Sequence, residues 1–481
     1  MLFSSLLFLF YFFPITLAVN YIFSFSRPLQ NVWLLITSLV FYAWGEPVLV
    51  LLLIGSIIAN WIFGIAIDRV RDNKNYVRIV MTVTCVFNLG VLFIYKYLGF
   101  VIRNINMVAG SRLIDFAGFA LPIGISFYTF QSISYVIDIL RKDAVVEKNP
   151  FYVGLYIAFF PQLVAGPIVR YSDIADQIRN RPAFNSSRFY EGCCQFISGM
   201  GKKVLISNAM AIVADRVFDL SVLGHHVVNI PASLAWVGLI AYTLQIFFDF
   251  SGYSEMAIGL ARMFGFTFLP NFNYPYISKS VGEFWRRWHI SLGSWFREYV
   301  YIPLGGSRVA NNDLMVRNNF VVWLLTGIWH GAEWTFLVWG LWNFIFIMME
   351  RIVQWDKRSI PNWLRHFYLM TVVMIGWLFF RTIDFYQAAQ YLLNCLGMNN
   401  NGFYSDLAIV LLKEYWLFFL FAIVSSTPVL LNITKLMNSE GMGIWGDIYS
   451  FFMPLVYIGV FVVCVTYLAK GAYSPFIYFN F

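Results

Sequence analysis

Long apolar segments separated by shorter polar ones follow one another along almost the whole chain. A helix needs about 20 apolar residues to cross the hydrocarbon core of a membrane. Residues 231–265 and 318–350 exceed that length and carry small, polar or ionisable residues in their middle, so either could break or re-enter. The pattern predicts an all-α polytopic membrane protein with about 11–13 transmembrane helices plus short interfacial or re-entrant helices. The candidate spans are 2–24, 30–44, 46–67, 76–100, 117–139, 150–168, 191–215, 231–265, 318–350, 366–382, 408–432 and 449–469.

Composition excludes several classes of protein. The chain is 60% hydrophobic and 12% charged, whereas an ordinary soluble domain is about 25% charged. A water-soluble enzyme, a disordered protein and a fibrous protein are therefore excluded. The net charge of +8 indicates basic cytoplasmic loops in a membrane protein. We expect no nucleic-acid partner. The five cysteines show no metal-ligand spacing, so we expect no metal site.

Basic residues near span ends predict the orientation of the chain in a membrane. Arg69, Arg71, Lys74 and Arg78 flank the third and fourth spans, so that loop should be cytoplasmic. The N-terminus then lies outside and the loop at Arg27 inside. The polar segment 171–190 should be a loop or surface helix on the cytoplasmic side. We expect one integral-membrane domain over residues 1–481, with a last transmembrane helix and aromatic tail at 449–481.

The first candidate site is the histidine in Gly327-Ile328-Trp329-His330-Gly331, deep inside an apolar run. Ionisable groups at membrane depth are costly and often functional. The flanking glycines allow another backbone or a ligand to approach closely. A neutral imidazole can take a proton from a hydroxyl near neutral pH. The alternative is a buried histidine that only hydrogen-bonds a neighbouring helix.

The second candidate site is an aromatic and basic segment between spans. It contains Trp285, Arg286, Arg287, Trp288 and His289, and continues to Arg297. On one helix, Trp285, Trp288 and His289 would share a face. Such a segment is typical of the membrane interface, where arginines contact phosphates. It could be an interfacial anchor without chemistry, or it could bind the phosphate groups of a cofactor such as coenzyme A.

The third and fourth candidate sites are polar positions within apolar runs. Gln245, Asp249 and Tyr253 recur every four residues and should line one helix face. Asp249 could orient a histidine by accepting its N–H; otherwise the three residues only join helices. The fourth site comprises residues 121–131, with Tyr128 and Gln131, and residues 160–167, with Gln162. Pro and Gly should break both runs, either as kinks or to line a cavity.

Six motifs together resemble the membrane-bound O-acyltransferase family, in its bacterial alginate O-acetyltransferase-like branch. They occur in family order and cover about residues 90–340. They are LPIGISFYTFQ at 121–131, FPQLVAGPIVR at 160–170, FDFSGYSEMAIG at 248–259, FWRRWHISL at 284–292, YIPLGG at 301–306 and TGIWHGA at 326–332.

The resemblance implies an acyl transfer across the membrane, from a cytoplasmic thioester to a hydroxyl outside. It implies that His330 is the catalytic residue and that His289 is the second family histidine. We expect Arg286, Arg287 and Arg297 to meet the donor phosphates. We also expect a central tunnel bordered by 121–131, 160–167, 245–255 and 284–334, with Trp285, Trp288 and Trp329 among its lining residues.

The resemblance further implies the partners and the location. Acetyl-CoA is the expected donor, with no cofactor bound permanently. A separate exported acetyltransferase would complete transfer to a polysaccharide, and the protein would be multi-pass in the bacterial cytoplasmic membrane, in contact with its lipids. Three alternatives stay open: a D-alanyl-type transferase that uses a carrier protein, a polysaccharide or lipid transporter, and a scaffold for exported enzymes.

The chain ends in an aromatic segment, Tyr473-Ser474-Pro475-Phe476-Ile477-Tyr478-Phe479-Asn480-Phe481. Such a tail should dock at the membrane interface, and an aromatic anchor is one interpretation. The other interpretation rests on a likeness to the tail of single-span accessory proteins in teichoic-acid D-alanylation. It predicts an even number of spans, an exported C-terminus and a relay in which Tyr478 carries the acyl group as an aryl ester. Covalent relay divides one difficult step into two easier ones.

Overall fold

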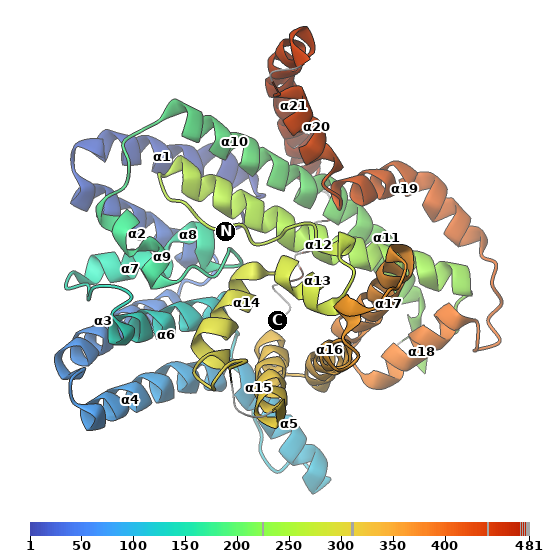
Figure 1. Cartoon of the computed structure of the whole chain (residues 1–481), viewed down its shortest axis with the longest axis horizontal. Coiled ribbons are helices and arrows are strands. Elements are labelled where there is room, and N and C mark those ends of the chain that lie inside the picture. Colours follow the sequence, from blue (N-terminus) through green and yellow to red (C-terminus); the bar gives the residue numbers. More distant parts are fainter. Residues whose placement is uncertain are drawn as a thin grey trace. The chain divides into compact units, whose positions relative to one another are not determined.

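The computed structural model describes residues 1–223, 226–308, 312–439 and 442–471, together with Tyr473, Pro475 and Ile477. The described residues are mostly helical (Figure 1). They form two compact units: Met1–Phe196 with Met256–Leu269, and Ile197–Glu255 with Pro270–Phe481.

The first unit contains the amino-terminal helices and the last turns of α12. Short π-helical or 3-10 segments, Phe8–Phe12, Phe23–Phe25 and Phe93–Tyr97, continue some of these helices. The helices are α1 (Phe13–Ile22), α2 (Arg27–Ala43), α3 (Val50–Val70), α4 (Lys74–Leu92), α5 (Leu98–Ala109), α6 (Ile125–Arg141), α7 (Pro150–Ala158), α8 (Phe160–Leu163), α9 (Tyr171–Arg179) and the start of α10 (Ser186–Gly201).

Two kinds of contact hold the first unit together. Phe3, Phe41 and Phe160 pack as a cluster of rings, with centroids 5.5–6.3 Å apart. Asn60 of α3 and Asn88 of α4 exchange side-chain amide hydrogen bonds of 3.0 and 2.8 Å. Paired amides satisfy each other inside an apolar layer, so polar residues can join helices there.

The second unit contains the longest and most aromatic helices. Its π-helical or 3-10 segments are Lys202–Ser207, Pro275–Ile277, Arg297–Tyr301 and Trp355–Lys357. The remaining elements are α11 (Asn208–Leu220), β1 (Val222–Leu223), β2 (His226–Val227), most of α12 (Ala232–Met263), α13 (Val281–Arg287), α14 (Ile290–Phe296), α15 (Asn312–His330), α16 (Trp334–Ile352), α17 (Asn362–Arg381), α18 (Phe385–Leu396), α19 (Asp406–Ser425), α20 (Val429–Met437) and α21 (Ile444–Ala469).

Glycine lets α15 and α16 pack closely in the second unit. A Cβ on Gly340 would lie 2.5 Å from the backbone oxygen of Trp323, and one on Gly327 would lie 2.6 Å from that of Phe336. Close backbone approach at small residues is a common way for membrane helices to associate. The contact fixes the end of α15, which carries His330.

Nine of the described helical segments are long and apolar enough to cross a membrane. This is fewer than the 11–13 spans that we expected, and the difference lies mainly in three segments. The helix α2 has 17 residues, as does α6. The expected span 150–168 is divided into α7 and α8, because Phe159, with ψ 113°, interrupts the helix just before Pro161. The chain is nevertheless an all-α polytopic membrane protein.

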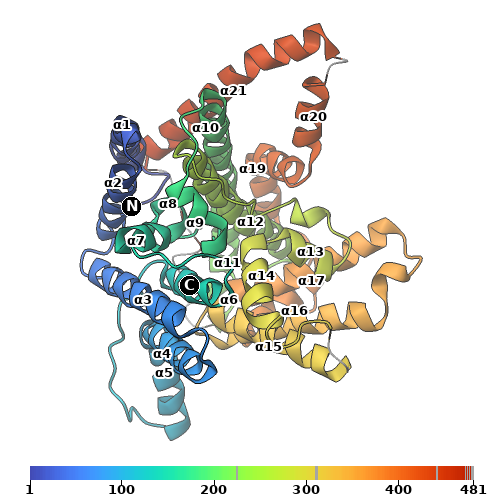
Figure 2. The same ribbon diagram turned by 60° about the vertical axis from the view of Figure 1, so that its left-hand side comes forward.

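The two overlong apolar stretches behave differently. Residues 318–350 break after His330 into α15 and α16, which Figures 1 and 2 label next to each other. The possible break in 231–265 does not occur, because α12 runs through as one helix of 32 residues. Its glycines can remain helical where a neighbouring backbone packs against them: a Cβ on Gly252 would lie 2.7 Å from the backbone oxygen of Gly199.

Candidate active site

The aromatic and basic segment folds as two short helices rather than one. The helix α13 ends at Arg287, Trp288 is extended, and His289 has a left-handed backbone with φ 45° before α14 begins. The expectation that Trp285, Trp288 and His289 share one helix face is therefore wrong. The break is stabilised from the preceding loop, because Ile290 N–H donates to the Asn271 backbone oxygen at 2.9 Å.

Hydrogen bonds fix the protonation pattern of His289. The Asn271 side-chain oxygen accepts the backbone N–H of Ser291 at 3.1 Å and lies 3.2 Å from His289 Nδ1. Because that oxygen can only accept, His289 Nδ1 must carry the proton and donate. The unprotonated nitrogen is then Nε2, which is buried and has no hydrogen-bond partner among the residues that the structure describes. An imidazole held this way presents a lone pair that can take a proton.

Burial keeps the His289 imidazole neutral. Its side chain is 2% exposed, and the Phe250 ring lies edge-on at 4.5 Å between centroids. Loss of solvation lowers the pKa of His289 from 6.5 to about 3, because a low-dielectric environment disfavours the charged form. His289 is thus uncharged at neutral pH.

Aromatic rings surround His330 at the end of α15. Its ring centroid lies 4.7 Å from those of Trp329 and Trp339, and 5.2 Å from that of Phe380. The interplanar angles of 74–82° place these rings edge to face. Such packing limits the rotation of the imidazole and makes its surroundings apolar. His330 itself is buried.

Trp329 links the two histidines. Its ring centroid lies 6.0 Å from that of His289 and 4.7 Å from that of His330. Trp285 joins the same aromatic group through Trp339, at 5.4 Å, and donates its indole N–H to Asn343 at 2.8 Å. The structure therefore brings together two histidines that are 41 positions apart in the sequence.

The predicted polar face of α12 is present, but Asp249 has other partners than expected. Gln245, Asp249 and Tyr253 are all buried on this helix. Asp249 forms an ion pair with Lys203, and accepts from Ser207 at 3.3 Å and from the Ile477 backbone N–H at 2.8 Å. Within the described part of the chain, Asp249 contacts no histidine, so the structure contradicts its expected role as an orienter of histidine.

The aromatic tail docks in the second unit at its described residues. Lys203 also donates to the Pro475 backbone oxygen, and the Tyr473 hydroxyl donates to Asp215 at 2.9 Å. Ile477 lines a cavity of about 400 Å³ that also contains Gln245 and Phe380. Phe380 is the residue whose ring contacts His330. Tyr478 lies outside the described residues, and its proposed relay stays a prediction.

The three arginines expected to meet donor phosphates differ in their surroundings. Arg287 forms an ion pair with Glu283 at 2.9 Å and donates to the Asn273 backbone oxygen at 3.2 Å. Arg286 and Arg297 are exposed. Trp288 is buried against Phe284 and Trp377, at 5.4 and 4.9 Å. Arg286 and Arg297 are therefore accessible, whereas Arg287 also supports the fold.

The fourth candidate site, in the first unit, is a buried polar group. The Gln162 side chain donates to the Tyr156 backbone oxygen. The Tyr156 hydroxyl donates to the Gln131 backbone oxygen at 3.2 Å. Gly124, with φ 74°, brings α6 against Leu163, since a Cβ there would meet the Leu163 oxygen. Buried atoms without a hydrogen-bond partner among the described residues are the Tyr128 hydroxyl, the Gln131 side-chain amide and Gln162 Oε1. Such groups are uncommon and often mark a place for water or a ligand.

Sequence reasoning missed residues that support these groups. Asn271 lies in a loop without a motif, so nothing in the pattern indicated that it holds His289. Lys203 could have been found by the criterion that selected Asp249, because it is a charge inside the predicted span 191–215. Over the residues that the structure describes, no group of three His, Cys, Asp or Glu side chains could hold a metal ion.

Comparison with known proteins identifies the family. The sequence model of the membrane-bound O-acyltransferase family matches residues 147–385. The chain is 35% identical to the probable alginate O-acetylase AlgI of Pseudomonas putida over all of both chains. It is 33% identical to the peptidoglycan O-acetyltransferase of Helicobacter pylori, over 83% of this chain and 80% of the relative. It is 29% identical to the teichoic acid D-alanyltransferase of Bacillus subtilis, over 49% and 60%.

The chain belongs to the membrane-bound O-acyltransferase family. It is therefore a membrane-bound enzyme that transfers an acyl group to a hydroxyl. The resemblance drawn from the six motifs is confirmed.

Proposed function

We propose that this protein transfers an acetyl group from a cytoplasmic thioester, acetyl-CoA, across the membrane for O-acetylation of a polysaccharide outside. The observation that carries the proposal is the pair of buried histidines linked by Trp329. Structural histidines are satisfied by hydrogen bonds, whereas His289 keeps a buried nitrogen without a partner in the described part of the chain. Neither transport nor scaffolding requires two buried histidines of this kind.

The relatives support acetyl transfer rather than D-alanyl transfer. The relative matched over its whole length is named a probable alginate O-acetylase, and another, matched over 80% of its length, is named a peptidoglycan O-acetyltransferase. The D-alanyltransferase is matched over about half of this chain. We infer a polysaccharide acceptor, an exported acetyltransferase partner that completes the transfer, and a location in the bacterial cytoplasmic membrane.

The chemistry assigns a proton to a named group at each stage. His330 takes the proton of the attacking hydroxyl as its oxygen bonds to the thioester carbonyl carbon. The carbon–sulfur bond then breaks, and the imidazolium returns the proton to the leaving thiolate. His289, neutral and with Nε2 unprotonated, stabilises the position of the reacting groups or shares the proton. General base catalysis of this kind contributes about 10²–10⁴ in rate.

Tyr478 is the proposed first acceptor of the acetyl group. The docking of Pro475 and Ile477 against Lys203 and Asp249 supports this idea, because it anchors the tail on the helix that carries Gln245. An acetyl ester of tyrosine would then pass its group to the exported partner. Phenol, with a pKa of about 10, is a better leaving group than a sugar hydroxyl.

Surface-glycan mass spectrometry in the producing cells tests the proposal. His330→Ala should abolish O-acetylation while the protein still accumulates in the membrane. The matched control is His366→Ala, which removes an exposed histidine of α17 from the same unit. Acetylation near the wild-type level in His330→Ala would contradict the catalytic role.

A second variant separates the relay from the transfer reaction. Tyr478→Phe keeps the aromatic ring and removes only the hydroxyl. Loss of glycan acetylation, with thioester hydrolysis by the purified protein retained, is the expected outcome. Normal glycan acetylation in Tyr478→Phe would show that the tail is an anchor.

A further inference from the structure

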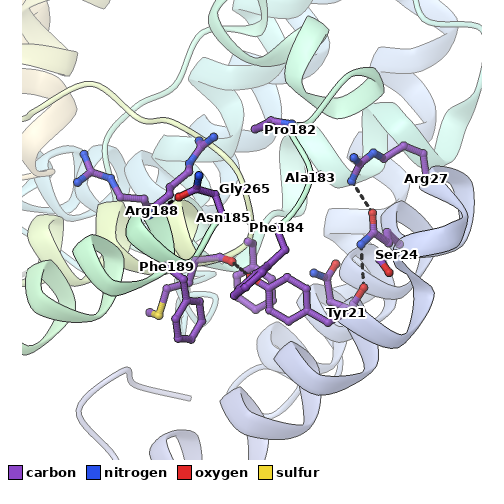
Figure 3. A pocket seen from close by; sticks show the side chains of 15 residues that line it. Tyr21, Ser24, Arg27, Pro182, Ala183, Phe184, Asn185, Arg188, Phe189 and Gly265 are labelled. Carbon is purple, nitrogen blue, oxygen red and sulfur yellow. Dashed lines mark hydrogen bonds between the residues drawn. The ribbon is translucent and has the colours of Figure 1, made fainter.

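A basic pocket lies in the first unit, and none of its lining residues belongs to the four candidate sites described above. Its volume is about 370 Å³. It is formed by the end of α1, the start of α2, the loop and first turns of α10, and the end of α12 (Figure 3). Figure 3 shows Arg27 and Arg188 at two sides of the pocket, with the rings of Tyr21 and Phe184 between them. No acidic side chain belongs to its lining as described.

Three arginines of the lining carry positive charge into this pocket. Arg27 donates to Gln30 at 2.6 Å and to the Arg181 backbone oxygen at 2.5 Å. Arg188 donates to the Thr267 hydroxyl at 2.6 Å. These bonds hold the guanidinium groups in place through neutral acceptors, which do not cancel their charge.

One of the three lining arginines has an acidic partner. Arg262 contacts Glu191 at 3.2 Å, and the Glu191 side chain is 57% exposed. An ion pair open to water stabilises little and can exchange its partner readily. The pocket therefore keeps a net positive charge.

A fourth arginine, Arg181, directly precedes the lining residue Pro182. It is 4% exposed, and its two terminal nitrogens lack hydrogen-bond partners in the described part of the chain. Its guanidinium lies over the Phe266 ring at 4.4 Å. Burial, and then the neighbouring charge of Arg27, lower the pKa of Arg181 to about 9. A buried cation without an anion is unfavourable, so an anionic ligand would stabilise this region.

Apolar side chains beside the pocket indicate which anion it meets. Ile22 is 65% exposed, Phe25 77% and Phe184 61%. In a membrane protein, exposed apolar side chains of this kind can contact acyl chains. A ligand that joins a phosphate to acyl chains fits both the arginine-lined pocket and the exposed apolar side chains beside it. The loop at Arg27 also lies on the side that the basic residues predict to be cytoplasmic, where anionic headgroups are exposed.

We propose that this pocket binds the phosphate-bearing headgroup of an anionic phospholipid, with its acyl chains along Ile22, Phe25 and Phe184. Arginine forks pair with phosphate oxygens through two parallel hydrogen bonds. Basic pockets between transmembrane helices are known to hold anionic headgroups. The inference does not depend on the acyl-transfer chemistry.

Lipid retention by the purified full chain tests the proposal. The protein is reconstituted with phosphatidylglycerol and phosphatidylcholine, washed in detergent, and its bound lipid is measured by mass spectrometry. Wild type should retain phosphatidylglycerol selectively, and each of Arg188→Gln and Arg262→Gln should lower retention about five-fold. Arg69→Gln removes a charge outside the pocket and should change nothing. Equal retention by wild type and both pocket variants would overturn the proposal.

Photolabelling of the unaltered protein avoids the question of whether a variant folds. A photoreactive phosphatidylglycerol should label residues 21–27 and 182–189, and excess unlabelled phosphatidylglycerol should prevent this labelling. Labelling spread evenly over the apolar helices would contradict the site. Displacement of the label by inorganic phosphate or coenzyme A alone, without lipid, would assign the pocket to a free phosphate and overturn the lipid assignment.

Discussion

The surroundings of the two histidines differ in kind. Asn271 and Ser291 hold His289 through its Nδ1 atom, at 3.2 and 3.4 Å. Three aromatic rings surround His330 at 4.7–5.2 Å. Hydrogen bonds fix the tautomer of His289, whereas ring packing fixes the orientation of the His330 imidazole. The comparison shows that the loop residue Asn271 sets the protonation pattern of His289, whereas the packing of α15 against α16 sets the orientation of His330.

Removing both histidines tests whether these two surroundings serve one step. His330→Gln and His289→Gln should each lower the single-turnover rate of acetyl transfer by about 10²–10⁴. The double variant should lose little more than either single variant, because groups that act as a unit are not additive. A double variant whose loss equals the product of the two would show separate roles. His366→Gln is the control for loss of a histidine.

Changing the hydrogen-bond acceptor of His289 tests the first half of the comparison. In Asn271→Asp, a carboxylate would still accept the Nδ1 proton and would raise the pKa of His289 from about 3 by about 1–3 units. The acidic limb of the pH–rate profile should then move to higher pH. Asn273→Asp adds the same charge at an exposed position on the same loop. Identical pH–rate profiles for wild type and Asn271→Asp would show that residue 271 does not influence the pKa of His289.

Altering the contact between α15 and α16 tests whether helix packing sets the orientation of His330. Gly340→Ala would push α16 away from the Trp323 backbone oxygen and would displace Trp339, the preceding residue, from His330. Overpacking of this kind costs about 1–3 kcal/mol. Thermal unfolding in detergent measures the loss. Gly55→Ala in α3, where a Cβ has nothing within 4 Å, should leave the unfolding temperature unchanged. Equal unfolding temperatures for Gly340→Ala and wild type would contradict the close contact.

Acid should destabilise the protein partly through His289. The folded-state pKa is about 3 and the unfolded value about 6.5, so the unfolded chain binds the proton first as pH falls. The contribution is complete above pH 6.5 and is lost progressively toward pH 3, by up to about 1.4 kcal/mol per pH unit. Unfolding temperatures of wild type should fall more steeply than those of His289→Gln. Parallel slopes would contradict the buried neutral imidazole.

The sequence predicted the parts of the molecule that depend on pattern. The length of the apolar runs and the composition indicated the helical membrane fold, and the excess length and the small, polar and ionisable residues of 318–350 indicated that this run could break. The motifs selected His289 and His330, which lie near each other through Trp329. What could not be predicted depended on tertiary contacts: Asn271 carries no signal of its own, and the left-handed backbone at His289 needs the loop that supports it.

Two differences from the sequence predictions have clear physical causes. Fewer helices than expected have the length and hydropathy to cross a membrane, because α2 and α6 have 17 residues each and Phe159 interrupts the apolar run 150–168. The role expected for Asp249 was wrong because a periodic carboxylate can pair with any nearby cation. Lys203, from a different helix, provides that cation, and a pattern along one helix cannot reveal it.

The contact at Gly124 also restricts how this protein can evolve. A side chain there would strain a left-handed backbone by about 1–2 kcal/mol and would meet the oxygen of Leu163, which is main chain and cannot rotate away. No single substitution elsewhere relieves both penalties. We therefore expect the two motif segments to tolerate change only together, and grafting one of them into a distant relative without the other should fail.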